Sequence, residues 1–144
     1  MKILLAVDGS PPSEAAVDEL CSRPWPDGTE VRVVTATVSL PPSFPVAPKG
    51  VIDGFAERER VQAAALVAQT QARIRERADE LATSTGLLEG PPARAIVEEA
   101  ERWGADLIVL GSQGLGAIKR FFLGSVSHAA ALYAPCSVRI VRRS

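Results

Sequence analysis

The sequence predicts one α/β domain, spanning residues 1–144, with a three-layer, open parallel sheet. Two short apolar runs, KILLAV at 2–7 and ADLIVLG at 105–111, are typical of strands buried on both faces. Stretches with helical periodicity separate the strand-like runs, and this alternation indicates a parallel sheet covered by helices on both sides. A chain of 144 residues is long enough for one domain with a real core and short for two.

Five segments are predicted to be strands, because they are apolar or rich in β-branched residues and are bounded by turn residues. The third is interrupted by Gly86 and is expected to be short and weak. In the last, Val138 and Ile140 share one face. The predicted strands are 2–7, 30–38, 83–90, 105–111 and 136–142.

Helices are predicted between these strands. The first begins with Ser10 as a capping hydroxyl and Pro11 at the first helical position. The third ends just before Gly104, a residue suited to a helix C-terminus. The predicted helices are 10–22, about 55–80, 91–103 and 125–134, and a loop with four prolines fills 39–54.

Composition excludes several classes of function. Sixteen basic and 17 acidic residues nearly cancel, which argues against a broad nucleic-acid or membrane surface. No apolar run is long enough to span a bilayer, and the N-terminus is typical of a strand rather than a signal peptide. Cys21 and Cys136 lack metal-ligand spacing, and a single histidine rules out a multi-histidine zinc site. We therefore expect two buried, reduced thiols in a cytoplasmic protein.

The segment GSQGLGAIKRFFLGS at 111–125 is the strongest functional signal. It lacks the P-loop lysine, since Ala117 stands there, and it lacks the third glycine of a dinucleotide fingerprint. Gly111 and Gly114 would allow a tight turn, and Gly124 and Ser125 open a helix whose free amides favour an anion. In the alternative interpretation, Ser125 merely caps the helix and the glycines only turn the chain. The residues alone leave both interpretations open.

Three stretches resemble the universal stress protein family, of the UspA type. They are KILLAVDGS at 2–10, VEEAERWGADLIVLGSQGLG at 97–116 and FFLGSVSHAAALYAPCSVRIVR at 121–142. The spacing Gly-x2-Gly-x9-Gly-Ser from Gly111 is similar to the signature of the ATP-binding branch. The resemblance implies a Rossmann-like fold with strand order 3-2-1-4-5, a homodimer, and an adenine nucleotide held mainly by backbone amides and small side chains.

The resemblance also implies where the nucleotide lies. The first two strands would border the adenosine through Ala6, Val7 and Asp8 and meet the adenine at Ala36. Asp8 could help to hold Mg²⁺, because hard cations prefer oxygen ligands, or it could be only a turn residue before Gly9. The ribose and phosphates would lie on the backbone of Gly111, Ser112, Gly114, Gly116, Gly124, Ser125, Val126 and Ser127.

Two departures from the family pattern affect this site. His128 stands where many relatives carry the glutamate of a capping box, and Gln113 replaces a basic residue that could pair with phosphate. Lys119 and Arg120 could compensate, or they could be solvated surface charges.

The implied function is a cytoplasmic stress-response regulator that binds ATP without turning it over. The alternatives are a slow ATPase or phosphotransferase with Asp8 as general base, an adaptor that binds AMP or cyclic AMP, and a structural dimer with an empty pocket. Dimerisation is expected through the last strand, 136–142, with apolar contacts from Val138 and Ile140. No nucleic-acid or membrane partner is expected, and the sequence does not indicate which stress or protein partner is involved.

Overall fold

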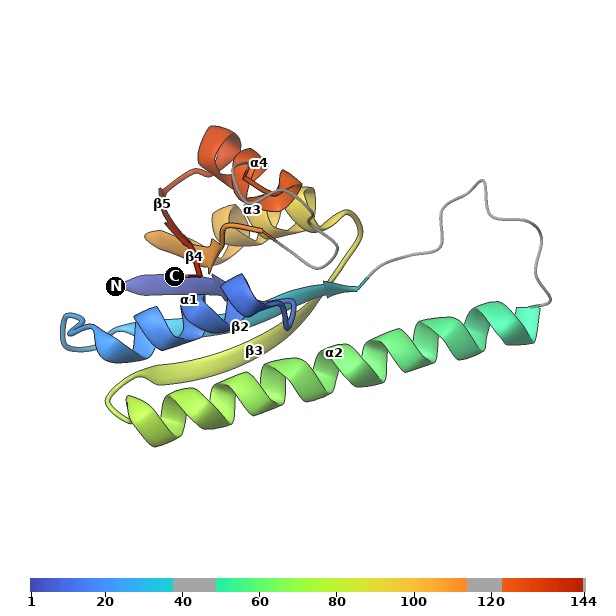
Figure 1. Cartoon of the computed structure of the whole chain (residues 1–144), viewed down its shortest axis with the longest axis horizontal. Helices are drawn as coiled ribbons and strands as arrows, with labels where there is room; N and C mark the ends of the chain where they lie inside the picture. Colours follow the sequence, from blue (N-terminus) through green and yellow to red (C-terminus); the bar gives the residue numbers. More distant parts are fainter. Residues whose placement is uncertain (38–48, 114–122, 144) are drawn as a thin grey trace.

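The structure is a computed structural model that describes residues 1–37, 49–113 and 123–143. Strands and helices alternate along the described chain, as the sequence predicts (Figure 1). The elements are β1 (Lys2–Ala6), α1 (Pro11–Ser22), β2 (Glu30–Thr37), α2 (Lys49–Arg77), β3 (Ala82–Glu89), α3 (Pro92–Trp103), β4 (Leu107–Gly111), α4 (Ser125–Tyr133) and β5 (Ser137–Val141).

The five strands form one parallel sheet in the order β3-β2-β1-β4-β5, which confirms the expected order. β1 lies at the centre, where Leu5 is in register with Val33 of β2 and with Val109 of β4. β3 and β5 are the two edges of the sheet. The expected three-layer α/β architecture is therefore present.

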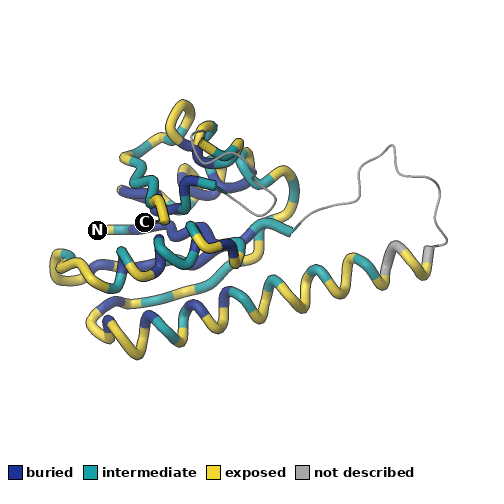
Figure 2. Tube along the Cα trace, viewed as in Figure 1, coloured by how far each residue is buried: buried dark blue, intermediate teal, exposed yellow. Residues whose placement is uncertain are grey.

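Each face of the sheet carries its own core. Along β1, Ile3 and Leu5 pack in the cluster with α1 and α2, whereas Leu4 and Ala6 pack in the cluster with α3 and α4. This alternation is the period of two that a strand imposes on its side chains. The buried residues consequently concentrate along the strands, and most exposed residues lie on the helices and turns (Figure 2). No helix in the described ranges is both long and apolar enough to cross a membrane.

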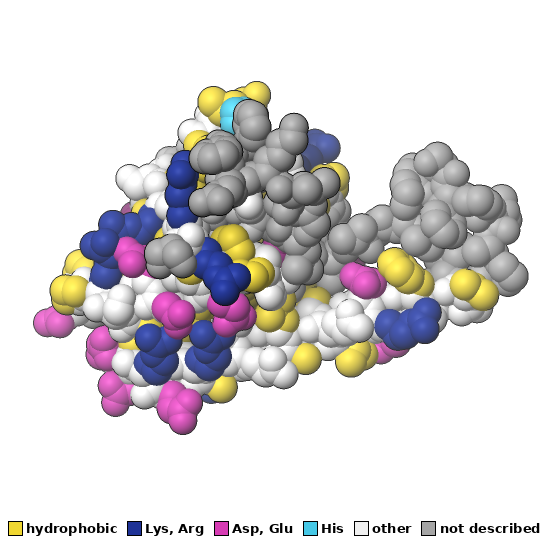
Figure 3. Space-filling view, viewed as in Figure 1, with side chains coloured by type: hydrophobic (Ala, Val, Ile, Leu, Met, Phe, Trp, Pro, Cys, Tyr) yellow, Lys and Arg dark blue, Asp and Glu magenta, His cyan; other side chains and the backbone are white. Residues whose placement is uncertain are grey.

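Opposite charges lie interspersed on the surface over α1 and α2 (Figure 3). Arg77 of α2 forms an ion pair with Asp18 of α1 at 2.6 Å, and Arg73 pairs with Glu14. Hydrogen bonding to Asp18 raises the pKa of the Arg77 guanidinium. These exposed pairs join the two helices, and each contributes about 1 kcal/mol or less.

The start of α2 differs most from the prediction, and the other boundaries agree to within about three residues. α2 begins at Lys49, so 49–54 is helical and not loop. The rest of the predicted loop, 39–48, lies outside the described residues. The last proline of that stretch is Pro48, and after it only Gly50 and Gly54 oppose the helix. Each costs about 1 kcal/mol in a helix interior, which is not enough to end it.

β3 is a regular strand and not the weak, interrupted one that was predicted, although its length matches the predicted 83–90. It pairs with β2 over eight residues, and Gly86 does not interrupt it. A Cβ atom at Gly86 would lie 2.5 Å from Nη2 of Arg32, so the arginine side chain occupies the space of the missing side chain. Gly86 therefore accommodates a neighbour rather than weakening the strand.

Candidate functional site

The strand order reverses between β1 and β4 at the carboxyl edge of the sheet. The chain passes from β1 to β2 on one side, and later from β3 to β4 on the other. In open parallel sheets this switch point is where ligands bind. Asp8 follows β1 here and Ser112 follows β4, so two of the predicted site segments meet at the expected place.

The loop between β1 and α1 is a closed ring of hydrogen bonds. The Ser10 amide donates to Oδ1 of Asp8 at 2.9 Å, and the Asp8 amide donates to Oγ of Ser13 at 3.1 Å. The Ser13 amide donates to Oγ of Ser10 at 3.3 Å, which is the N-cap that the sequence predicts. Asp8 thus has a turn-forming role, and Gly9 takes a φ of 81° that suits glycine.

The first two strands place their predicted contact residues at this edge in different ways. Ala6 and Val7 are buried, in the cores on opposite faces of the sheet, and the Val7 amide donates to the carbonyl oxygen of Val34. Ala36 is half-buried and lies two residues beyond Val34, in register with Leu88 of β3. The side chains of Ala6 and Val7 therefore face the cores.

Gly111 lies at the end of β4, against the start of α1. A Cβ atom at this position would lie 2.6 Å from the carbonyl carbon of Pro12 and 2.7 Å from the amide nitrogen of Ser13. Its φ angle is not among the positive ones. Glycine is required here by the approach of α1, and not by the tight turn that the sequence suggested.

Ser112 joins β4 to both β5 and α4. Its amide donates to the carbonyl oxygen of Val141 at 2.8 Å, which extends the sheet pairing. Its carbonyl oxygen accepts from the Gly124 amide at 2.7 Å and from the Ser127 hydroxyl at 2.8 Å. These bonds bring the end of β4 together with the start of α4. The other predicted residues of this segment, Gly114, Gly116, Lys119 and Arg120, lie outside the described residues.

The N-terminus of α4 offers backbone donors. Gly124 is its N-cap and supplies no side chain, and the first helical bond runs from the His128 amide to the Gly124 carbonyl oxygen at 2.9 Å. The amides of Ser125, Val126 and Ser127 consequently have no acceptor within the helix. They lie at the positive end of the helix dipole, an arrangement that favours anions.

The three side chains at this helix start differ in exposure. Ser125 is exposed and Val126 is half-buried, whereas Ser127 is only 1% exposed. The Ser127 hydroxyl is engaged with the carbonyl oxygens of Ser112 and Gly124. Only the amide of Ser127 is left to meet a ligand, and its hydroxyl instead fixes the position of the helix.

Sequence reasoning missed a charged cluster on the α3 side of the sheet. Glu99 is 6% exposed and accepts from Nε of Arg32 at 2.9 Å and from Nε of Arg102 at 3.0 Å. Arg32 also donates to the carbonyl oxygen of Thr85. Hydrogen bonding to Glu99 raises the pKa of the Arg102 guanidinium. The signal available in the sequence was Arg32 itself, a charge inside the run EVRVV.

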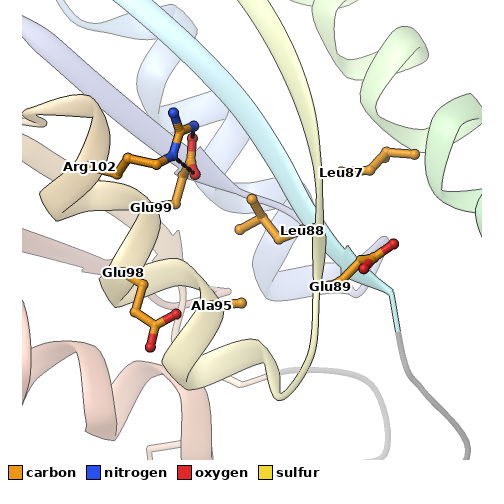
Figure 4. A pocket seen from close by; sticks show the side chains of 7 residues that line it. All are labelled: Leu87, Leu88, Glu89, Ala95, Glu98, Glu99 and Arg102. Atoms are coloured by element: carbon orange, nitrogen blue, oxygen red, sulfur yellow. Dashed lines mark hydrogen bonds and ion pairs between the residues drawn. The ribbon is translucent and has the colours of Figure 1, made fainter.

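A hollow of about 260 Å³ lies beside this cluster, between β3 and α3 (Figure 4). Glu99 and Arg102 turn toward each other at one end, and the apolar Leu88 and Ala95 lie between the strand and the helix. The residues that line it are Leu87, Leu88, Glu89, Ala95, Glu98, Glu99 and Arg102.

The two thiols are unpaired, and the described residues show no cluster of metal ligands. Cys21 and Cys136 are both free and half-buried rather than fully buried, and partial burial raises the pKa of each thiol. Within the described ranges, no group of three or more histidine, cysteine, aspartate or glutamate side chains is placed to hold a metal ion.

A five-stranded parallel sheet of order 3-2-1-4-5, covered by helices on both faces, defines a single-domain, open α/β protein. The chain belongs to the universal stress protein family, whose model matches residues 1–142. It is 38% identical to a universal stress protein of Thermus aquaticus over 145 residues, covering 97% of each chain.

Solved structures agree on the fold. The universal stress protein UspA from Lactobacillus plantarum superposes with a TM-score of 0.84 at 24% identity, covering 99% of this chain and 97% of that one. A universal stress protein in complex with cAMP superposes with a TM-score of 0.70 at 26% identity, covering 100% of this chain and 98% of that one.

Proposed function

We propose that this protein binds an adenine nucleotide, with ATP as the first candidate, at the carboxyl edge of the sheet. The observation that carries the proposal is the start of α4, where the amides of Ser125, Val126 and Ser127 lack helical acceptors beside the switch point. A nucleotide phosphate is the natural partner of such a helix end. The structural relative in complex with cAMP supports an adenine nucleotide as the ligand class.

The remaining predicted residues have places in this proposal. Ala6, Val7, Asp8 and Ala36 would border the adenosine, mainly through their backbone, since Ala6 and Val7 turn their side chains into the cores. Around the ribose and α-phosphate we propose Gly111, Ser112, Gly114 and Gly116, of which the last two lie outside the described residues.

A magnesium ion would fit only as a companion of the phosphates. Mg²⁺ in nucleotide sites is commonly held by one or two carboxylates together with phosphate oxygens and water. Asp8 is the carboxylate at this edge, and its Oδ1 already accepts the Ser10 amide. We propose that Asp8 supplies one ligand at most and that the phosphates supply the others.

We propose regulation rather than catalysis as the role of the bound nucleotide. Hydrolysis requires a group that activates water, and Asp8 is the candidate at this edge. Its hydrogen bonds to the α1 turn give it a structural task instead. The protein would then act as a cytoplasmic stress-response regulator whose partner contacts depend on the bound nucleotide. ATP turnover near roughly 1 per second, lost in Asp8→Asn, would contradict this role.

We further propose a homodimer through 136–142. β5 is an edge strand, and exposed edges are usually covered or paired. Val138 and Ile140 pack on the α3–α4 core but stay half-exposed, so part of their surface is available to a partner. Leu132 and Tyr133, at the end of α4, are also large apolar side chains that are 61% and 71% exposed. Sedimentation of the full chain should show a dimer at micromolar concentration, and a monomer there would contradict the proposal.

The role of the α4 amides can be tested with two substitutions at one position. Ser125→Ala removes the hydroxyl only, whereas Ser125→Pro also removes the amide donor. Proline is tolerated at the first helical position, and Gly124 has φ −65° and ψ 162°, a conformation allowed before proline. Both variants should therefore stay folded.

Calorimetric titration with ATP, AMP and cyclic AMP gives the readout. We expect Ser125→Ala to weaken binding by roughly tenfold or less and Ser125→Pro to weaken it by at least about tenfold more, as for a lost hydrogen bond to a charged group. Equal affinities for the two variants would show that the amide does not hold the ligand. Mass spectrometry of ligand released from the purified wild-type protein would identify which nucleotide it carries.

A further inference from the structure

We infer that Ser10 is a positioning residue for the proposed nucleotide site, because its hydroxyl, on a buried residue, connects the start of α1 to Gln113, just beyond β4. This inference rests on the proposed function. Ser10 is 2% exposed, and its Oγ donates to the carbonyl oxygen of Gln113 at 3.3 Å while accepting from the Ser13 amide at 3.3 Å. A hydroxyl has one donor and two acceptor positions, so it can make both bonds at once.

Ser10 is itself held in a fixed orientation. Its amide bonds to Asp8, the Asp8 amide bonds to Ser13, and the Ser13 amide returns to Ser10, which closes the ring. Helix capping needs only the acceptor side of the Ser10 hydroxyl. The donor side is free for a second task, and the structure uses it across 103 residues of sequence to reach Gln113.

The other end of this connection leads to the α4 amides. Gln113 follows Ser112, whose carbonyl oxygen accepts from the Gly124 amide and the Ser127 hydroxyl. Gly111, two residues earlier, lies directly against Pro12 and Ser13 of α1. The N-terminus of α1 and the N-terminus of α4 are thereby connected through a few direct contacts.

This arrangement has a specific consequence for ligand binding. The Ser10 bridge leads through Ser112 to the α4 amides proposed for the phosphates, whereas most of the adenosine contacts are proposed on β1, β2 and the residues that follow them. Loss of the bridge should therefore weaken the binding of a nucleotide with phosphates and leave adenosine binding nearly unchanged. If Ser10 contributed only to stability, its loss would weaken the binding of both ligands to the same extent.

The test compares Ser10→Gly with Ser10→Ala in the full chain. Both lack the hydroxyl, but glycine is nearly as good an N-cap as serine and alanine is a poor one, so their stabilities should differ. We expect both variants to bind ATP roughly three- to tenfold more weakly than wild type, the effect of one lost neutral hydrogen bond, and to bind adenosine within about twofold of wild type. Ile74→Val, a core change in α2, serves as the control and should lower stability without changing either affinity.

Wild-type affinity for ATP in both variants would overturn the inference, as would equal losses for ATP and adenosine or losses that follow the order of stability. If the wild type binds neither ligand, the proposed function fails by itself. Hydrogen exchange in the ligand-free protein then decides about Ser10. Faster exchange of the Ser112 and Gly124 amides in Ser10→Gly would support the bridge, and unchanged exchange would overturn it.

Discussion

Two clusters of polar side chains, each with a buried member at its centre, stand in contrast in this protein. The arginine–glutamate cluster of Arg32, Glu99 and Arg102 lies between β2 and α3 and is built from charges that pair with one another. The serine cluster consists of Ser10, Ser13, Ser112 and Ser127, at the carboxyl ends of the strands. Its Ser10, Ser13 and Ser127 hydroxyls bond to backbone groups, and the Asp8 carboxylate accepts the Ser10 amide.

The two clusters differ in whether they leave hydrogen-bond donors without a partner in the protein's secondary structure. In the arginine–glutamate cluster the buried carboxylate of Glu99 meets two guanidinium groups, so the charges compensate each other internally. In the serine cluster the hydroxyls of Ser10, Ser13 and Ser127 bond to backbone amides and carbonyl oxygens, while the adjoining amides at the start of α4 have no acceptor within the helix. Burial of polar groups is common to both, and uncompensated donors distinguish the candidate ligand site from the structural cluster.

The largest expected effect comes from inserting a methyl group between the two halves of the serine cluster. Gly111→Ala would place Cβ against backbone atoms of Pro12 and Ser13 that cannot move without displacing α1. We expect a loss of about 3 kcal/mol in the free energy of unfolding, measured by urea denaturation.

Gly54→Ala is the matched control for Gly111→Ala. A Cβ atom at Gly54 meets nothing within 4 Å, and the residue lies inside α2. The Gly54→Ala variant should be more stable than wild type by up to about 1 kcal/mol, because alanine favours the helix more than glycine does. A Gly111→Ala variant as stable as wild type would show that α1 does not approach β4 so closely.

Next in size is the removal of the shared carboxylate from the arginine–glutamate cluster. Glu99→Ala would leave Arg32 half-buried without its partner, and we expect a loss of about 2 kcal/mol, below the value for fully buried pairs because Arg102 is exposed. Arg102→Ala should lower stability less than Glu99→Ala does, because the Arg102 side chain is exposed to solvent. ATP affinity should be unaffected in both variants, and a calorimetric loss of binding would mean that this cluster is part of the ligand site.

Ser127→Ala, unlike the Glu99 and Arg102 variants, should weaken ATP binding. Its hydroxyl is buried, and its loss removes a bond to the Ser112 carbonyl oxygen, which keeps the Gly124 amide as a partner. We expect a loss of about 1 kcal/mol in stability together with weaker ATP binding, since the start of α4 would be less well placed. Thermal denaturation and calorimetry on the same sample measure both quantities. Unchanged ATP affinity would separate Ser127 from the site.

The smallest effect concerns the two thiols, which lie outside both clusters. Burial raises the pKa of Cys21 and Cys136, so the thiolate fraction of each at neutral pH is below that of a free cysteine. A thiol reagent should therefore react more slowly with the native protein than with the urea-unfolded chain. Because the folded pKa is raised, stability contributed by these thiols is present below the unfolded pKa and is lost as the pH rises through the folded pKa. Equal reaction rates in the two states would contradict this.

The sequence was sufficient to predict the sheet and most of the elements, because buried strands and amphipathic helices have distinct periods. It also predicted the Ser10 cap and the Gly104 helix end, which has a φ of 77°. These features depend on neighbours in the sequence. The segments that follow the first, second and fourth strands could likewise be assigned to the same end of the sheet, because parallel strands run in the same direction.

Features that depend on distant neighbours could not be predicted. The glycine pattern at Gly111 suggested a turn, whereas its cause is the backbone of α1, a hundred residues earlier. Gly86 suggested a weak strand, whereas its cause is Arg32 on the adjacent strand. The bridge from Ser10 to Gln113 and the pairing of Glu99 with two arginines are equally non-local. The sequence shows where small or charged residues stand, but the reason for each lies in tertiary contacts that the sequence pattern does not show.

The contrast between the two clusters can be tested most directly by following the backbone amide resonances of the isotope-labelled protein during titration with ATP. The account predicts that the amides of Ser112, Ser125, Val126 and Ser127 shift, and that those of Arg32, Leu88 and Glu99 stay in place. Shifts concentrated around the hollow between β3 and α3, or no shifts at saturating ATP, would contradict the assignment of the nucleotide site to the start of α4.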